Sequence, residues 1–359
     1  MTILWINLAI VFILSFFSRY FAVPANQTYS VAPIKPNKVL VLGVMVTLAL
    51  ISGLRSNIGD TFFYKHSYET NNFTWEFIQS QKDIGFGILQ MILKNYSNDP
   101  QILIFTTAVI TNLLIVGVLY KYSRMFELST YVYITGGLYL VSMNGMRQCL
   151  AAAIIFIGTK YLINGNWLKY ILIVLFASAF HESALVLIPI YFMVRFKAWS
   201  KATVILLGLA VLIVIGFDKF SEVLFSAIKD TEFGHYKSFN EGGASTMRVA
   251  VFGAPLVIAY FGREKLRKIF PESDYIVNMA VIGFVFMIVS TQNWIFARFS
   301  IYFNLYQLIL ISWIIKLIHE KDQRFFYYFL LVCYLLYYYY ESVISLNINY
   351  LSNYIQLGG

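Results

Sequence analysis

Four arginines, Arg55, Arg147, Arg248 and Arg298, each stand at the end of a long apolar run. A guanidinium group is a planar fork of N–H donors that suits the oxygens of a phosphate. Because burying such a charge among apolar residues is expensive, each arginine needs a partner there. We therefore expect the four to bind a diphosphate group in one cavity. The alternative is that each extends to solvent or pairs with a nearby acid, as Arg55 would with Asp60.

The segment around Arg147 carries two further polar residues, Asn144 and Gln148. On a helix these three side chains share one face, because residues three and four positions apart are neighbours. This pattern on an apolar helix predicts a substrate cavity, although a polar contact between two helices fits it as well. Tyr302 follows Arg298 at a similar spacing, and the same interpretation applies to that segment.

Three residues are candidates for a general base: His181, Glu182 and Asp60. His181 lies within an apolar stretch, where an ionisable residue predicts a functional site. A neutral imidazole accepts a proton near neutral pH. Glu182 would orient His181 or act as the base itself, and the alternative for His181 is a hydrogen-bonded residue at a helix break. We favour His181 as the base and Asp60 as a ligand of the acceptor sugar.

Asp60, Tyr64 and Tyr68 follow one another at intervals of four residues, which predicts that they line one helix face. A carboxylate beside tyrosine rings suits a saccharide, because the rings pack on its C–H surfaces and the polar groups bind its hydroxyls. The alternative for Asp60 is an N-cap that opens the helix, and the two roles are compatible.

Metal and cofactor chemistry has little support in the sequence. Asp230 and Glu232 form an acidic pair of the kind that holds a divalent cation, but their acidic surroundings favour a solvated loop. A cluster of His and Cys ligands and a glycine-rich phosphate loop are both missing from the sequence. We therefore expect no metal and no cofactor.

The composition is that of a membrane protein. Of the 359 residues, 59% are hydrophobic and 13% are charged, and a spanning helix needs about 20 apolar residues. The net charge of +9 does not indicate nucleic-acid binding, because the basic residues fall between the apolar runs. We predict an all-α fold with about twelve spanning or partly inserted helices, at residues 2–21, 38–54, 101–120, 129–143, 147–163, 167–181, 183–195, 202–217, 247–261, 275–292, 297–317 and 325–345.

The distribution of basic residues predicts the orientation of these helices. Most of the 27 basic residues lie in alternate connections, which the positive-inside rule assigns to the cytoplasm. Both termini then lie outside. We predict a single polytopic domain that spans residues 1–359 and lies in the cytoplasmic membrane. This topology leaves two long outer segments, 55–100 and 218–246. In the first, we predict amphipathic helices within residues 58–98 that lie at the membrane–water interface. Residues 167–195 form two short helices meeting at His181 or one long tilted span.

Four motifs of the sequence together resemble the EpsG family of bacterial exopolysaccharide polymerases, which are Wzy-like in role and occur in Gram-positive biofilm operons. They are Gly-Leu-Arg at 53–55 with Ile-Gly-Asp-Thr at 58–61, Met-Arg-Gln at 146–148, Phe-His-Glu-Ser-Ala at 180–184, and Ala-Arg-Phe at 297–299. The resemblance implies an enzyme that joins oligosaccharide repeat units carried on undecaprenyl diphosphate. It acts at the outer face of the cytoplasmic membrane, in association with other exopolysaccharide export proteins.

The candidate residues suit a single displacement that inverts the anomeric carbon without a metal, because arginines supply the positive charge. The first alternative is a ligase that moves the glycan to another acceptor. The second is a flippase or transporter of the lipid-linked unit, which would place ionisable residues near the middle of the bilayer and show internal repeats. A membrane acyltransferase is a further alternative, for which a lone His181 is a weak argument.

Overall fold

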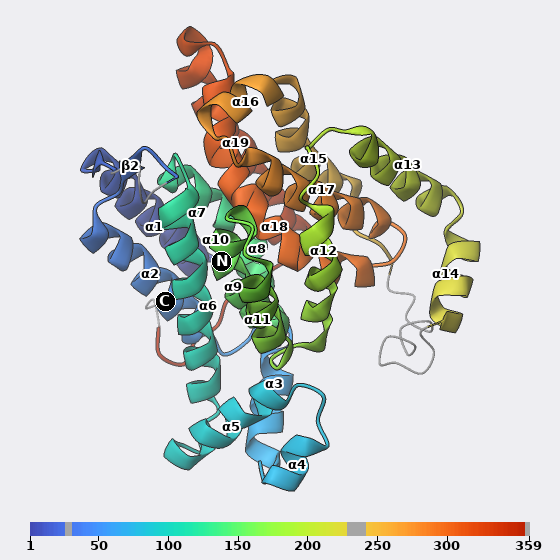
Figure 1. Ribbon diagram of the computed structural model, residues 1–359. Helices are drawn as coiled ribbons and strands as arrows, with labels where there is room; N and C mark the ends of the chain where they lie inside the picture. The colour runs from blue at the N-terminus through green and yellow to red at the C-terminus, as the bar shows by residue number, and fades with distance from the viewer. Residues whose placement is uncertain (26–30, 228–241, 356–359) are drawn as a thin grey trace. The chain divides into compact units, whose positions relative to one another are not determined.

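The computed structural model describes residues 1–25, 31–227 and 242–355, which are mostly helical (Figure 1). This confirms the all-α class of membrane protein expected from the composition. The chain divides into two compact units. The first unit holds residues 1–191 together with 311–359, and the second holds residues 192–310.

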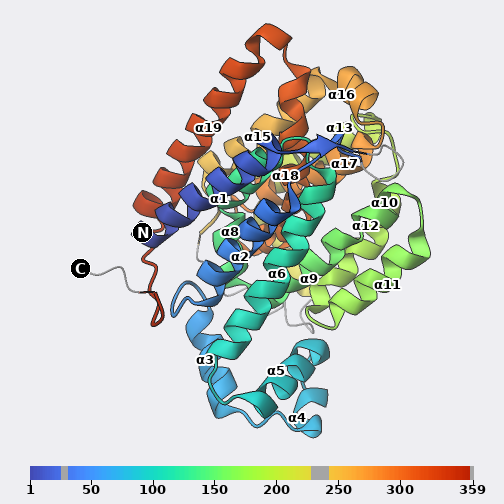
Figure 2. The ribbon, with the colours of Figure 1, turned by 90° about the vertical axis from the view of Figure 1, so that its left-hand side faces the viewer.

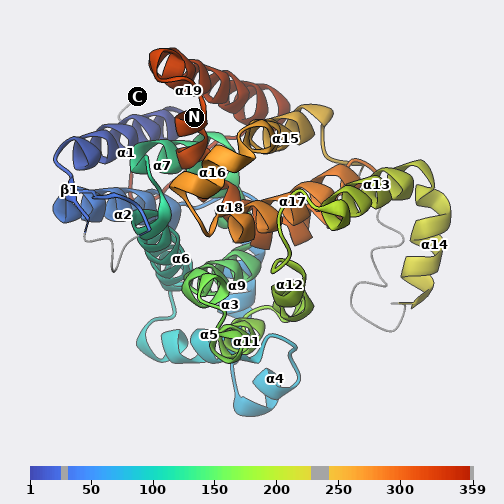
Figure 3. The same cartoon turned by 45° about the horizontal axis from the view of Figure 1, so that its top comes forward.

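Five helices of the first unit form a row: α1 (Thr2–Tyr20), α2 (Lys38–Gly53), α6 (Gln101–Tyr122), α9 (Met146–Ile157) and α11 (Trp167–Ser178). Each packs on the next one in that order, as Figure 3 shows. Apolar helices suit a bilayer because all their backbone hydrogen bonds are made internally. Two short antiparallel strands, β1 (Val23–Pro24) and β2 (Ile34–Lys35), lie between α1 and α2 in the sequence.

Glycines interrupt two of the predicted spans. The predicted span at 129–143 consists of α7 (Phe126–Thr135) and α8 (Leu138–Asn144), separated by Gly136 and by Gly137, whose φ is +88°. The predicted span at 147–163 consists of α9 and α10 (Thr159–Ile163), separated by Gly158. These breaks were not predicted, because apolar residues continue through each of them.

The segment at 58–98 is helical as predicted, with three short helices: α3 (Thr61–Thr70), α4 (Trp75–Gln79) and α5 (Ile84–Tyr96). Both α3 and α5 pack against α6 (Figure 1). The segment has a small hydrophobic core formed by Tyr68, Phe73, Ile78, Phe86, Leu93 and Leu103. This core holds the start of α5 in a defined place, which matters for the site described below.

After α11 the chain forms η1 (Glu182–Val186) and α12 (Leu187–Met193). After residue 314 it forms η3 (Ile315–Leu317), η4 (Glu320–Asp322), α19 (Gln323–Tyr339) and the π-helix η5 (Tyr340–Ser345).

The beginning of the first unit's chain lies close to its last long helix. The ring centroids of Trp5 and Tyr338 are 5.0 Å apart, so α1 begins beside the end of α19 (Figure 2). This arrangement agrees with termini on one side of a membrane, while the side itself stays a prediction.

The second unit consists of α13 (Lys201–Ile215), α14 (Phe217–Ala227), α15 (Thr246–Phe261), α16 (Arg263–Ile269), α17 (Ser273–Val289) and most of α18 (Ile295–Ile314). The helix α17 packs against both α13 and α15. The axes of α13 and α14 meet at a bend of 96°. Because α14 covers Phe217–Ala227, the predicted outer segment 218–246 begins with a helix. Asp230 and Glu232 lie outside the described residues.

Every predicted span falls on one helix or on two consecutive helices, and many of these helices are short. In the described part of the chain, three helices are long and apolar enough to cross a membrane: Thr2–Tyr20, Gln101–Tyr122 and Ile295–Leu317. A fourth is counted if the bent pair α13 and α14 is taken as one span. The number of crossings therefore stays a prediction.

Candidate functional site

A buried carboxylate joins the segments that the sequence analysis treated separately. One oxygen of Asp83, Oδ2, lies 2.7 Å from Nη1 of Arg147 and 3.5 Å from Nδ1 of His181. The other oxygen, Oδ1, accepts the backbone N–H of Glu182 at 3.2 Å. The Asp83 side chain is 8% exposed, against 44% for Arg147 and 19% for His181. We call these three side chains the Asp83 cluster.

Asp83 reaches this place because the start of α5 is attached to the end of α11. The backbone N–H of Gly85 donates to the carbonyl of Ala179 at 2.7 Å. A Cβ atom at position 85 would lie 2.9 Å from both the Cβ and the carbonyl oxygen of Ala179. Such a distance is too short for a real side chain, so a glycine is required for this approach. Asp83 is the N-cap residue of α5, where the helix dipole favours a negative charge.

His181 lies at a break between helices, as one of the two sequence alternatives predicted. Its backbone is extended, with φ −160° and ψ 116°, between the end of α11 and the start of η1. The Nδ1 atom faces Asp83, which leaves Nε2 as the ring nitrogen able to accept a proton. Asp83 therefore orients the imidazole. The Glu182 side chain, expected to do so, is exposed, and its backbone N–H holds Asp83 instead.

Two aromatic residues flank Arg147. Its Cζ atom lies 6.0 Å from the ring centroid of Phe86, and the Tyr64 ring packs edge-on against Phe86 at 6.0 Å. Burial raises the pKa of the Tyr64 phenol, and the charge of Arg147 together with a side-chain hydrogen bond between the two partly opposes that shift. Tyr64 therefore belongs to the surroundings of Arg147, as well as to the helix that Asp60 opens.

The predicted common face of Asn144, Arg147 and Gln148 does not exist in the structure. Gly145, with ψ 62°, separates the last residue of α8, Asn144, from the start of α9. Asn144 and Arg147 are exposed, whereas Gln148 is buried within α9. A glycine without a side chain to hold the helix allowed a break that spacing alone does not indicate.

Asn144 instead holds the turn that leads into α3. Its Oδ1 atom accepts the backbone N–H of Asp60 at 2.9 Å. Gly59 has φ +54°, and a Cβ atom there would lie 2.1 Å from that same oxygen. Asp60 occupies the N-cap position of α3, but its side chain makes no capping hydrogen bond. The Asp60 carboxylate is half-buried, near Tyr64, and its predicted role as a sugar ligand stays a prediction.

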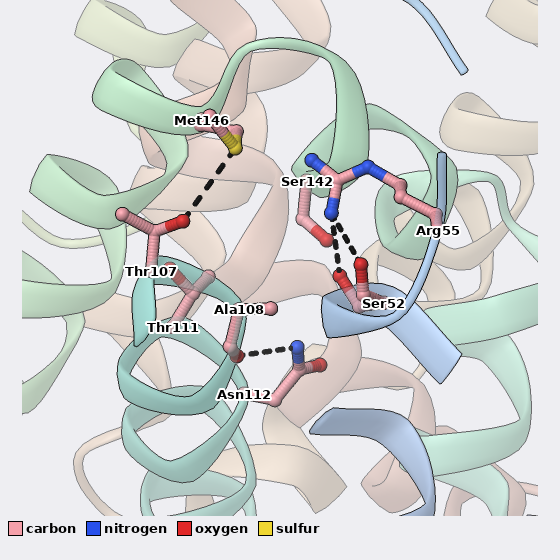
Figure 4. A pocket seen from close by; sticks show the side chains of 8 residues that line it. All are labelled: Ser52, Arg55, Thr107, Ala108, Thr111, Asn112, Ser142 and Met146. Carbon is pink, nitrogen blue, oxygen red and sulfur yellow. Dashed lines mark hydrogen bonds between the residues drawn. The ribbon is translucent and has the colours of Figure 1, made fainter. Parts of the chain in front are cut away.

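Arg55 is 1% exposed and binds protein groups (Figure 4). Its Nη1 donates to the carbonyl of Ser52 at the end of α2, and its Nη2 donates to the carbonyl of Met143 near the end of α8 at 2.6 Å. Its Nε donates to Oγ1 of Thr61 at 3.0 Å, so a hydroxyl takes the place of the Asp60 carboxylate that was the alternative partner. Burial lowers the pKa of Arg55 to about 10, which leaves it charged at neutral pH. The negative ends of two helices stabilise this charge.

A small, tightly lined pocket adjoins Arg55 (Figure 4). Its polar side chains bind nearby groups: Asn112 donates to the carbonyl of Ala108 at 2.9 Å, and Thr107 reaches Sδ of Met146 at 3.5 Å. The pocket is therefore a polar contact between helices, and is lined by Ser52, Arg55, Thr107, Ala108, Thr111, Asn112, Ser142 and Met146.

Tyr68 does not line a face for sugar. It is fully buried in the core of the 58–98 segment, and its hydroxyl donates to the carbonyl of Ser97 at 2.9 Å. A spacing of four residues places side chains on one face, but it does not say which part of that face is covered. Here α5 and the start of α6 cover the end that carries Tyr68 and leave Asp60 accessible.

Three predicted site residues belong to the second unit. The Cζ atom of Arg298, in the first turn of α18, lies 4.6 Å from the ring centroid of Trp294. Arg248 stands in the first turn of α15, where its backbone N–H is capped by Ser245 at 3.3 Å. Tyr302 is buried, with 1% exposed. The expectation that these residues share one cavity with Arg147 stays a prediction.

Sequence reasoning missed Asp83, the residue at the centre of the cluster. An isolated acid after Lys82 in a polar segment resembles a solvated charge. The one local signal is its place before Ile84-Gly85-Phe86-Gly87, an apolar helix start with glycines that permit close packing. Its partners lie 64 and 98 positions away, so no local pattern predicts the contact.

The comparison with known proteins gives one match. Residues 38–355 match the family described as the EpsG family, and this range includes the Arg55 turn, Asp83, Arg147 and His181. No curated protein and no solved structure matches the sequence. Because the matched range covers most of the chain, the protein belongs to the EpsG family.

Proposed function

We propose that the protein joins oligosaccharide repeat units carried on undecaprenyl diphosphate into exopolysaccharide, at the outer face of the cytoplasmic membrane. Membership of the EpsG family fits a polysaccharide polymerase role in exopolysaccharide biosynthesis, and the apolar helices fit a membrane-embedded protein. The observation that carries the proposed chemistry is the Asp83 carboxylate placed between a half-exposed arginine and a histidine. That arrangement combines a cation for a leaving group with an oriented base.

Arg147 is assigned to the lipid diphosphate. As the bond to the sugar breaks, the diphosphate oxygen gains negative charge, and a fixed cation aimed at that oxygen lowers the barrier. Asp83 holds one nitrogen of the guanidinium at 2.7 Å and so fixes the direction of the fork. Arg147 also stands in the first turn of α9, where the helix dipole attracts an anion.

His181 is assigned to the acceptor hydroxyl. Nε2 takes the proton of that hydroxyl while its oxygen forms a bond to the anomeric carbon of the donor sugar. The bond from that carbon to the diphosphate breaks, and its electron pair leaves with the lipid diphosphate. Attack opposite the leaving group inverts the anomeric centre. Asp83 holds Nδ1 and stabilises the imidazolium that forms, as a carboxylate does in other histidine bases.

The test is chain growth by the purified protein in lipid vesicles that contain a synthetic lipid-diphosphate oligosaccharide. We expect longer glycans and one lipid diphosphate released for each unit added. His181→Gln should lower the turnover number by about 10² to 10⁴-fold. His319→Gln, which changes an exposed histidine, should leave it unchanged.

The roles of the residues are separated by a second pair of variants. Asp83→Asn should lower turnover and leave folding intact, because the amide keeps the shape but loses the charge that stabilises imidazolium. If Asp60→Asn abolishes chemistry while His181→Gln retains it, Asp60 is the base. Movement of the lipid-linked unit across the vesicle without chain growth would replace the polymerase with a transporter, and transfer only to a non-lipid acceptor would replace it with a ligase.

A further inference from the structure

The C-terminal segment after η5 runs along the end of α2, and we call its residues 349–354 the strap. The backbone N–H of Ser56 donates to the carbonyl of Leu351 at 2.8 Å. The side chain of Asn57 makes two bonds, accepting the N–H of Leu351 at 2.8 Å and donating to the carbonyl of Asn349. At the far end, the Tyr354 hydroxyl donates to Asp99 at 3.3 Å.

The strap also completes the end of α2. The last carbonyl groups of a helix have no partner within the helix and must find one elsewhere. The Tyr350 hydroxyl donates to the carbonyl of Ile51 at 2.8 Å, and the Ser352 hydroxyl donates to the carbonyl of Leu54 at 2.6 Å. Arg55 donates to the carbonyl of Ser52, so the strap and this arginine cap the same helix.

Two hydrogen bonds connect this helix end with the segment that leads to Arg147 of the Asp83 cluster. Arg55 holds the carbonyl of Met143 in α8, and the next residue, Asn144, holds the N–H of Asp60. Arg147 follows three residues after Asn144. A loose strap would remove the bonds on Leu54, Ser56 and Asn57, and would leave Arg55 and Gln101 to hold this end of the turn before α3.

We infer that the strap is a positioning element of the site, which keeps Asn144 and the start of α9 in the geometry that chemistry needs. This inference rests on the proposed function for its effect on turnover, but its structural part is independent of that function. Asn57 is the sharpest place to test it, because its side chain supplies two of the bonds and is not among the residues assigned to the chemistry.

The experiment compares Asn57→Ala with Asn72→Ala, which changes an exposed asparagine between α3 and α4. Hydrogen exchange of the full chain in vesicles is measured at the backbone amides of Ser56 and Asp60, together with the turnover number, KM and Tm. For Asn57→Ala we expect faster exchange at both amides and a turnover number lower by about tenfold, the factor equivalent to one net hydrogen bond. KM and Tm should change little, and Asn72→Ala should resemble the natural protein.

A deletion of the chain from residue 349 onward should show the same changes in larger measure. Faster exchange confined to Ser56, with Asp60 exchange and turnover unchanged, would overturn the positioning role. A fall in Tm that accounts for the whole loss of turnover would overturn it too, because that pattern describes stability alone. If the natural protein shows no chain growth, the proposed function fails, while the exchange at Asp60 still decides whether the strap orders the turn.

Discussion

Arg55 and Arg147 stand at comparable places in the sequence, but their side chains differ in exposure and in binding partners. Both follow an apolar run, and both were expected to bind diphosphate. Arg55 is 1% exposed and donates to backbone carbonyls and a threonine hydroxyl. The Arg147 side chain is 44% exposed and pairs with a carboxylate that also approaches a histidine.

The difference shows that the partners of an arginine say more about its role than its depth does. Carbonyl dipoles at the ends of α2 and α8 offset the charge of Arg55 and leave its guanidinium committed to holding the fold. Arg147 pairs with the buried Asp83 carboxylate, and its own side chain is 44% exposed, so a ligand can reach it. The first region is expected to respond to mutation through stability, and the second through chemistry.

The largest effect is expected at Arg147. Arg147→Ala should lower the turnover number by about 10² to 10³-fold, the usual result of removing one group that stabilises developing negative charge. Arg147→Lys should remain impaired, because a point charge cannot reproduce the fork, although it keeps Asp83 paired. Chain growth in vesicles is the measurement, with Arg263→Ala as the control because that arginine is similarly exposed and also ion-paired. Full activity of Arg147→Ala would remove the contrast between the two arginines.

Arg55 should respond in the opposite manner. Arg55→Ala leaves buried carbonyl groups without a donor, which costs about 1–3 kcal/mol for each unsatisfied group. We expect a clear loss of folded protein in detergent, followed by tryptophan fluorescence during denaturation. The folded fraction should lose less turnover than Arg147→Ala does, because Arg55 acts on the site only through the carbonyl of Met143. An Arg55→Ala protein of normal stability that cannot bind the lipid diphosphate would return Arg55 to the substrate site.

The smallest effect is expected at the turn that connects the two regions. Gly59→Ala introduces a side chain at a φ of +54° and forces Asn144 to move away from Asp60. Strain of this kind costs about 1–3 kcal/mol. We expect a modest fall in Tm and a several-fold loss of turnover, whereas Gly117→Ala, where a Cβ atom meets nothing within 4 Å, should show neither. If Gly59→Ala and Gly117→Ala had the same Tm and the same turnover, the turn would have no influence on the site.

The helices themselves could be predicted well from the sequence. Runs of apolar residues placed the boundaries of α1, α2, α6, α15 and α17 within a few positions, because the length of a buried helix is visible in composition. The break at His181 was one of the two alternatives that the sequence left open for residues 167–195, and the structure shows it. The glycine breaks at 136–137 and 158 were missed, because a glycine in an apolar run is tolerated in many helices.

The site could be predicted only in part. Arg147 and His181 were recognised by an ionisable group in apolar surroundings, and the structure brings the two onto one carboxylate. Asp83 and the strap were missed because their partners are distant in sequence and their own surroundings are polar. Tyr68 was misplaced for a related reason, since helical periodicity does not reveal which neighbour covers a face.

The strap also orders events in time. It joins residues 292 to 299 positions apart, so the end of α2 leaves the ribosome long before its final cap exists. At about 5–20 residues per second, Arg55 waits on the order of 15 to 60 s for the strap. A nascent chain therefore carries every residue of the Asp83 cluster before the final cap of α2 exists, so this cap can form only late in synthesis.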